Sequence, residues 1–231
     1  MHRLIKACAA LWLSALPLSA ENAPVVVELF TSQGCSSCPP ADKLLHELAD
    51  RSDVIALALH VDYWDYIGWQ DEFAEPANAD RQRAYANLAG RRSIYTPEMV
   101  INGQTDIVGA RPMQLSKAIA EHKARPSTVK LMVERQGDDI TIKAMALRPA
   151  DGPMTVRMLR YTPLSETRIT RGENSGHTYH YANVTRDWQE LAQWDGTSTL
   201  KLTANAPGDA PVVVLIQSAG PGAIQAAAQI K

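Results

Sequence analysis

The residues of this chain that are best suited to chemistry are two cysteines separated by two serines, Cys35-Ser36-Ser37-Cys38. The thiolate form of a cysteine attacks disulfides, and a second thiol close to it can then displace the bound partner by intramolecular attack. A thiol at the start of a helix lies near unpaired backbone N–H groups and the positive end of the helix dipole, which favour its thiolate. The motif therefore predicts Cys35 as the nucleophile, because it lies nearer the loop and is more exposed, and Cys38 as the resolving thiol.

Two other roles explain the cysteine pair less well. A disulfide across two intervening residues closes almost no loop, so it adds little stability to a folded chain. A structural zinc site needs four ligands, and the one closely spaced histidine pair, His177 and His180, falls where residues three apart point to opposite faces of a strand. A reactive pair that needs no metal and no cofactor is therefore the favoured interpretation.

The start of the chain has the pattern of a secretory signal peptide. A basic segment, Met1–Lys6, precedes an apolar run, Ala7–Leu18, and the small residues Ser19-Ala20. The apolar run is shorter than the about 20 residues that span a bilayer, and a proline interrupts it. We therefore expect residues 1–20 to be removed, and the mature protein to be periplasmic or secreted without a membrane segment.

The charge of the chain is nearly balanced. It has 23 Lys and Arg residues against 25 Asp and Glu residues, with no long run of one sign. This composition does not favour binding to nucleic acid or to an anionic membrane surface. The expected partners are exported proteins whose thiols or disulfides exchange with the cysteine pair.

Strands and helices are expected to alternate around the cysteines. An apolar, β-branched segment that ends at Phe30 predicts a buried strand before the pair, and a helical pattern begins at Pro40. Asn102-Gly103 suits a tight two-residue turn between two short strands. In chain order, the other expected elements are a strand at 54–61, a helix at 78–88, strands at 98–101 and 105–108, and a helix at 112–122.

After about residue 126 the helical pattern weakens. Strand-like segments are separated by Gly, Pro, Asp and Asn, which is typical of an antiparallel sandwich. We therefore expect two domains, an N-terminal one over residues 24–125 and a mainly β, sandwich-like one over residues 126–231. The strand-like segments of the second domain are 129–135, 140–147, 155–161, 179–187, 199–203 and 212–218.

The order of elements in the N-terminal half resembles the thioredoxin fold. The C-x-x-C pair follows the first strand, and Tyr95-Thr96-Pro97 stands directly before the third. The resemblance implies an α/β thioredoxin-like N-terminal domain, a cis bond before Pro97, and a role for Thr96 and Pro97 in the loop that binds the substrate backbone. The alternative is that Pro97 only begins an edge strand, where proline is tolerated.

Longer segments are similar to domain-of-unknown-function family 1223, a family of secreted bacterial proteins. These segments are Phe30–Asp42, His60–Asp65, Thr96–Gly103 and Gly172–Gly176, so the resemblance covers nearly the whole mature chain. This resemblance supports predictions of the fold and of export, but it does not indicate a substrate.

Three positions differ from ordinary thioredoxins. The tryptophan that usually precedes the first cysteine is Gly34 here, which removes a hydrophobic cover. Pro39 follows the second cysteine, and because a residue before proline is moved away from helical angles, the helix is expected to start late and leave Cys38 outside it. The buried acid of the first strand is Glu28, seven residues before Cys35 rather than six. Glu28 is therefore either the proton acceptor for Cys38 or an acid paired elsewhere.

An aromatic and acidic segment, Asp62–Phe73, follows the second strand. It should lie at the edge where open α/β sheets bind ligands, and Trp64 is its candidate substrate contact, in a lid or groove beside the cysteines. The alternative is a loop that packs its aromatic rings against the second domain. Gly172–Gly176 only superficially resembles a hydrolase motif, because Asn174 stands where a nucleophile elbow needs serine.

These patterns predict an exported thiol–disulfide oxidoreductase that uses Cys35 and Cys38. Two alternatives from other classes stay open. Two adjacent thiolates suit Cu(I), and Met99 or a histidine could complete a copper site. The third possibility is a disulfide that is inert, in a scaffold that only binds partners.

Overall fold

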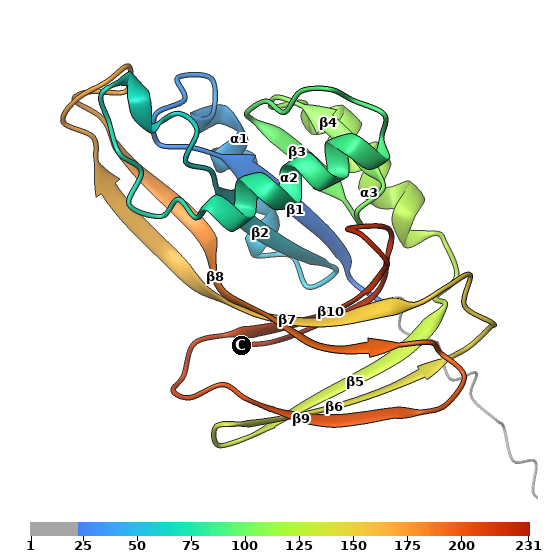
Figure 1. Cartoon of the computed structure of the whole chain (residues 1–231). Helices are drawn as coiled ribbons and strands as arrows, with labels where there is room; N and C mark the ends of the chain where they lie inside the picture. The colour runs from blue at the N-terminus through green and yellow to red at the C-terminus, as the bar shows by residue number, and fades with distance from the viewer. Residues whose placement is uncertain (1–22) are drawn as a thin grey trace, which may run out of the picture.

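A computed structural model describes residues 23–231 (Figure 1). The predicted signal peptide, residues 1–20, lies outside this range. Within residues 23–231, no helix is long and apolar enough to cross a bilayer. The elements are, in chain order, β1 (Val25–Thr31), α1 (Pro39–Ala49), β2 (Val54–His60), η1 (Asp65–Ile67), α2 (Pro76–Leu88), β3 (Glu98–Ile101), β4 (Thr105–Val108), α3 (Pro112–Lys123), β5 (Val129–Gln136), β6 (Asp139–Ala146), β7 (Met154–Arg168), β8 (Thr178–Trp194), β9 (Leu200–Asn205), β10 (Val212–Ser218) and β11 (Ile224–Ile230).

The cysteine turn lies at the carboxyl end of two neighbouring parallel strands, β1 and β2. Both strands are buried along their whole length and pair in parallel, which suits their apolar, β-branched sequences. α1 begins at Pro39 and Pro40, which are tolerated there because the first N–H groups of a helix have no helical partner. Since β1 ends at Thr31 and α1 begins at Pro39, the connection between them carries both cysteines.

The predicted fold class, an α/β thioredoxin-like N-terminal domain followed by a mainly β, sandwich-like C-terminal domain, is wrong. The elements of the N-terminal half come in the expected order, but their four strands form only half of one eight-stranded sheet, ordered β11-β10-β7-β8-β2-β1-β3-β4. A second sheet has three strands, β5-β6-β9. The described chain is therefore mainly β, and its three α-helices cover parts of a sheet that runs through both halves.

β8 joins the two halves by running parallel to β2, with backbone pairing at Ala58↔Val184. Two buried side chains of β8 complete the joint. Asn183 Nδ2 donates to the carbonyl of Ala56 at 2.8 Å, and Thr185 Oγ1 donates to the carbonyl of Ala58 at 3.0 Å. Each of these bonds spans 127 residues of sequence, and such a pairing leaves no local pattern from which it can be predicted.

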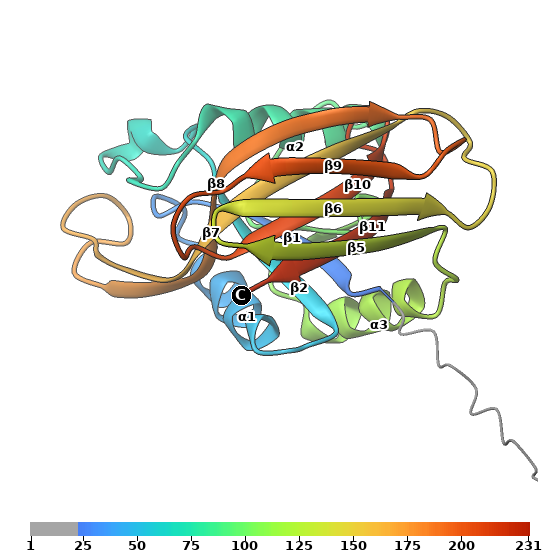
Figure 2. The same ribbon diagram turned by 90° about the horizontal axis from the view of Figure 1, so that it is seen from below.

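The main sheet curls so that its two halves pack on one another, which produces four layers (Figures 1 and 2). α1 and α3 cover the outer face of the N-terminal strands. The inner face of these strands packs, together with α2, on β7 and β10. The three-stranded sheet covers the remaining face of β7 and β10. The N-terminal and C-terminal halves therefore share a hydrophobic core.

β7 and β8 form a hairpin that is much longer than the sequence pattern predicted. β7 has 15 residues and β8 has 17, whereas the expected strands were 155–161 and 179–187. The part of the hairpin nearest its turn is largely polar and exposed, so it lacks the apolar alternation that marks a strand. In Figure 1 the hairpin runs past β2 toward α1 and the segment after β2. Residues 169–177, which connect β7 to β8, are called the hairpin tip below.

Replacing Thr185 with valine tests the joint between β2 and β8. Valine keeps the shape of the side chain but removes the hydroxyl that donates to the buried carbonyl of Ala58. Because an unpaired buried polar group costs about 1–3 kcal/mol, we expect Thr185→Val to lower the free energy of unfolding by that amount in urea titrations. Thr178→Val, at the exposed start of β8, is the control. Equal losses in the two variants would contradict a role for this bond in joining the halves.

Candidate functional site

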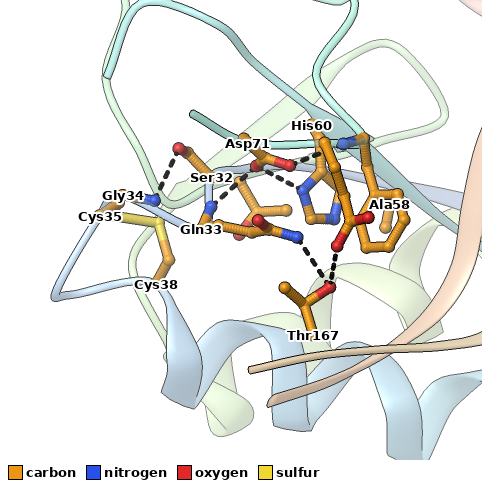
Figure 3. Close-up of polar contacts among 12 residues, drawn as sticks. Ser32, Gln33, Gly34, Cys35, Cys38, Ala58, His60, Asp71 and Thr167 are labelled. Atoms are coloured by element: carbon orange, nitrogen blue, oxygen red, sulfur yellow. Dashed lines mark hydrogen bonds and ion pairs between the residues drawn. A yellow bond between two sulfur atoms is a disulfide. The ribbon is translucent and has the colours of Figure 1, made fainter. Parts of the chain in front are cut away.

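Cys35 and Cys38 form a disulfide in the turn between β1 and α1 (Figure 3). The backbone of the turn supports it, because the N–H of Cys35 donates to the carbonyl of Ser32 at 3.1 Å and the N–H of Cys38 to that of Cys35 at 3.2 Å. Cys38 is the N-cap residue of α1, and its carbonyl accepts from the N–H groups of Ala41 and Asp42. Despite the proline that follows it, Cys38 therefore adjoins the helix, and the disulfide lies near the positive end of the helix dipole.

Both cysteines are covered by the surrounding chain. Cys35 is 3% exposed and Cys38 is 0% exposed, although Ser36 and Ser37 between them are exposed. Ser37 Oγ lies 3.3 Å from the Sγ of Cys35, close enough to donate a hydrogen bond to a thiolate at that position. Both cysteines are therefore buried, and the exposed position that was expected for Cys35 is not found.

Gln33, two residues before Cys35, is the centre of the hydrogen bonds that close the site (Figure 3). Its backbone N–H donates to Asp71 Oδ2 at 2.8 Å, and its carbonyl accepts from Asn174 Nδ2 at 2.9 Å. Its side-chain oxygen accepts from Trp69 Nε1 at 2.7 Å, and its Nε2 donates to Thr167 Oγ1 at 3.2 Å. These four partners come from the segment after β2 and from the β7–β8 hairpin. Sequence analysis missed Gln33, because a buried glutamine in a turn has no distinctive pattern.

Trp64 connects the cysteine turn to the loop before β3. The Thr96–Pro97 bond is cis, as the resemblance implied. Trp64 Nε1 donates to Thr96 Oγ1 at 2.7 Å, and the backbone and Cβ of Trp64 lie beside Gly34. A Cβ at position 34 would meet both Trp64 Cβ and Trp64 O at 3.3 Å, so any side chain there would require Trp64 to shift by a few tenths of an ångström. Gly34 thus leaves space beside the cysteine turn for Trp64, which comes from the segment after β2.

Glu28 lies on the face of β1 that packs against α2. It is fully buried and pairs with Arg81, whose Nε lies 2.6 Å from Glu28 Oε1, and with the hydroxyl of Tyr85 at 2.5 Å. Because side chains alternate along a strand, Glu28 shares its face with Phe30, whereas Leu29 packs on the side of α1. The structure therefore does not bring this carboxylate to the cysteines.

Asp42 is a buried acid near the cysteines that sequence analysis did not select. It follows Cys38 by four residues in α1, is 7% exposed, and accepts a hydrogen bond from Thr31 Oγ1 at 2.8 Å. Burial raises the pKa of Asp42 to about 7, against the opposing effects of His60 and of the Thr31 hydroxyl. The helical spacing could have indicated that Asp42 is buried, because Asp42 lies on the same buried face of α1 as Leu45.

A second polar pair lies at the end of β2. His60 Nδ1 is 2.7 Å from Asp71 Oδ2, the same oxygen that accepts from the N–H of Gln33. The imidazole packs edge-on against the ring of Tyr181, with 4.8 Å between ring centroids, and its Nε2 is buried without a hydrogen-bond partner among the described residues. His60 therefore fixes the orientation of Asp71, which in turn holds the backbone of the cysteine turn.

Other candidate ligands lie apart from one another. Within residues 23–231, no group of three or more His, Cys, Asp or Glu side chains is placed to hold a metal ion. His180 pairs with Glu166 at 3.3 Å, and Met99 is fully buried in the core beneath α1 and α3. A cavity of about 480 Å³ lies between α3 and β11, where His122 and Gln225 line it, away from the cysteine turn.

A family model described as "Protein of unknown function (DUF1223)" matches residues 26–217, and the chain belongs to this family. A search of curated proteins found no match. A crystal structure of a protein from Agrobacterium tumefaciens, a structural-genomics target, is similar at 31% identity with a TM-score of 0.77. That similarity covers 91% of this chain and 96% of the other.

HBP35 of Porphyromonas gingivalis shares the fold at a TM-score of 0.61. The identity is 14%, and the alignment covers 90% of this chain and 75% of that protein. Both similarities extend over the N-terminal and C-terminal halves together, as expected if one sheet runs through both.

Asp42→Asn tests the buried carboxyl through the pH dependence of stability. Between its usual pKa of 3.8 and its folded pKa of about 7, the folded chain binds more protons than the unfolded chain. The stability that this group contributes is therefore fully present below about pH 4 and is lost as the pH rises to about 7. Relative to Asp42→Asn, we expect the free energy of unfolding of the native protein to fall by about 1.4 kcal/mol per pH unit in this window.

Urea titrations at a series of pH values measure this difference. Glu47→Gln, on the exposed side of α1, is the matched control and should keep the native pH profile. Parallel profiles for the native protein and Asp42→Asn would mean that Asp42 titrates as an ordinary surface acid.

Proposed function

We propose that this member of the DUF1223 family is an exported thiol–disulfide oxidoreductase that acts on thiols or disulfides of other exported proteins. The observation that carries the proposal is the position of the Cys35–Cys38 disulfide, which closes a turn at the N-terminus of α1, one helical turn before the buried carboxyl of Asp42. Export is part of the proposal because of the leader pattern in residues 1–20. A relationship to the thioredoxin-like superfamily is also part of it, and the place of the pair between a strand and a helix supports it.

Cys35 is the proposed nucleophile. In the reduced protein its sulfur lies near the first turn of α1, where unpaired N–H groups and the helix dipole favour negative charge. The hydroxyl of Ser37, 3.3 Å from Sγ in the disulfide form, offers a hydrogen bond to the thiolate. These features stabilise the attacking species without a cofactor.

The exchange reaction proceeds in two balanced steps. The thiolate of Cys35 attacks one sulfur of a partner disulfide, the partner S–S bond breaks, and the other partner sulfur leaves as a thiolate. The thiol of Cys38 then loses its proton and attacks the Sγ of Cys35, which releases the second partner sulfur. The partner gains two electrons and the Cys35–Cys38 pair loses two. In reverse, the pair oxidises a dithiol.

Asp42 is the proposed proton acceptor for Cys38. A base is most effective when its pKa lies near the working pH, and burial raises the pKa of Asp42 to about 7. Cys38 is the N-cap residue of α1 and has helical backbone angles, so its side chain and that of Asp42, four residues later, lie on the same side of the helix. Glu28 is not proposed for this step, because Arg81 and Tyr85 hold its carboxylate on the other face of β1.

A redox-inert disulfide is the second candidate, and the burial of both cysteines favours it. With exposures of 3% and 0%, the pair is protected from partners as the structure stands. In this case the disulfide fixes the turn, and the protein acts as a binding module. The reduction potential distinguishes the two candidates.

Equilibration with glutathione measures this potential. If the pair exchanges with proteins, its potential should lie between about −270 and −120 mV, the range of known exchange catalysts. The fractions of oxidised and reduced protein can be counted by alkylation and intact mass. A potential below about −300 mV would assign the disulfide to the inert class.

The rate of the second step tests the role of Asp42. A mixed disulfide between Cys35 and a small thiol should resolve more slowly below about pH 7 in the native protein, because Asp42 becomes protonated. Asp42→Asn should slow resolution by roughly 100-fold at pH 8 and flatten its pH profile, and Glu47→Gln should change neither. Resolution is followed by release of the small thiol in rapid-mixing experiments. A native rate in Asp42→Asn would remove Asp42 from the mechanism.

A further inference from the structure

The tip of the β7–β8 hairpin binds directly to the backbone of the cysteine turn. Asn174 is 5% exposed, whereas the residues on either side of it, Glu173 and Ser175, are exposed. Its Nδ2 donates to the carbonyl of Gln33 at 2.9 Å and to the carbonyl of Cys35 at 3.1 Å. A side chain from the C-terminal half of the sequence thus holds the residue proposed as the nucleophile.

The tip has its own internal structure. The N–H of Gly176 donates to the carbonyl of Ile169 at 2.8 Å, and the N–H of Ser175 to that of Gly172 at 3.2 Å. Gly172 has a φ of +76°, which suits glycine, and the position of its missing Cβ lies 3.3 Å from Trp69 Cβ. The shape of the tip is therefore fixed by hydrogen bonds of its own, in addition to its contacts with the cysteine turn.

The hairpin has a second attachment beside the tip. Thr167 Oγ1 accepts from Gln33 Nε2 at 3.2 Å and donates to Glu72 Oε1 at 2.5 Å (Figure 3). Together, Thr167 and Asn174 connect the hairpin to two sides of Gln33. Thr167 is only 7% exposed, so both attachments are shielded from water while the hairpin is docked.

Exchange needs access that the docked state does not give. A partner sulfur must approach the Sγ of Cys35 directly, yet Cys35 is 3% exposed while the serines that follow it are open to solvent. The hydrogen bonds of Asn174 are between neutral groups, and such bonds have small net free energies. Two such bonds therefore add only a small net free energy to the docked state.

We propose that Asn174 is a positioning residue that latches the β7–β8 hairpin onto the cysteine turn and keeps Cys35 covered until a partner protein displaces the hairpin. This inference deepens the proposed exchange function and rests on it for its purpose. Asparagine suits the role because one uncharged nitrogen supplies both donors. Aspartate has nearly the same shape, but would place a carboxylate against two carbonyl oxygens.

The latch is tested by the rate at which the Cys35–Cys38 disulfide of the mature chain is reduced. The probe is tris(2-carboxyethyl)phosphine, which cleaves a disulfide to two thiols while an oxygen from water converts it to the phosphine oxide. We expect Asn174→Asp and Asn174→Ala to accelerate reduction roughly tenfold, because the covered state loses two hydrogen bonds.

Two further variants are the controls. Asn174→Gln keeps an amide donor and should react at a rate closer to the native one. Ser175→Ala, at the exposed neighbouring position, should react at the native rate.

A purely structural role of Asn174 predicts a different result in the reduction experiment. If Asn174 only stabilises the fold, its variants will lower the melting temperature and leave the reduction rate of the folded protein unchanged, which overturns the proposal. If the Asn174 variants do not fold, Thr167→Val, which removes the second attachment, should accelerate reduction in the same way. An unchanged rate in a folded Thr167→Val would then overturn it.

Two measurements, the reduction potential and the reduction rate, test the exchange function and the latch independently. A reduction potential in the inert range, with faster reduction in the Asn174 variants, supports the latch and rejects exchange. A potential in the exchange range, with equal reduction rates in native and variant proteins, rejects the latch and supports exchange.

Discussion

The cysteine turn depends on the hydrogen bonds of one buried residue, Gln33. A polar group that is buried without a partner costs about 1–3 kcal/mol, so the two backbone groups and the side-chain amide of Gln33 all require partners. Asp71, Trp69, Thr167 and Asn174 supply them, and they come from both halves of the sequence. The turn that carries the disulfide therefore takes this form only when the halves are joined, and β8 provides the joint by lying next to β2.

The same constraint shapes the proposed chemistry. Reactive cysteines are usually partly exposed, whereas here both are buried, and the hairpin and the segment after β2 bind to the backbone and side chain of the turn. Enclosure also raises the pKa of Asp42, because the carboxyl is shielded from water next to the site. The surroundings that make a proton acceptor available thus also limit access to the sulfur. In the proposed mechanism Asp42 takes part in activation and Asn174 controls access.

The sequence predicted the local features of the fold well. The turn between β1 and α1, the hairpin at Asn102-Gly103 and the cis bond before Pro97 each follow from a short motif or from the resemblance that the motif supports. The disulfide itself is also present. Each of these features depends on residues that are close together in the chain. A short segment of sequence is therefore enough to predict it.

The features that the sequence did not predict depend on long-range pairing. No local pattern places β8 beside β2, and this one pairing joins strands from both halves of the chain in the eight-stranded sheet. Local patterns also do not show which buried acid lies near the cysteines, Glu28 or Asp42. The alternation of β1 shows that Glu28 and Leu29 face opposite ways, but not which of these faces carries α1. β11 was missed because alanine and glutamine dominate it and give little strand signal.

The central claim is that the Cys35–Cys38 pair exchanges with disulfides of other proteins. The most direct measurement is the second-order rate constant for the reaction of the reduced protein with a disulfide-bonded peptide at pH 7, compared with that of free cysteine. An activated thiolate that a partner can uncover predicts a rate constant well above that of free cysteine. A rate constant equal to or below that of free cysteine would contradict the account.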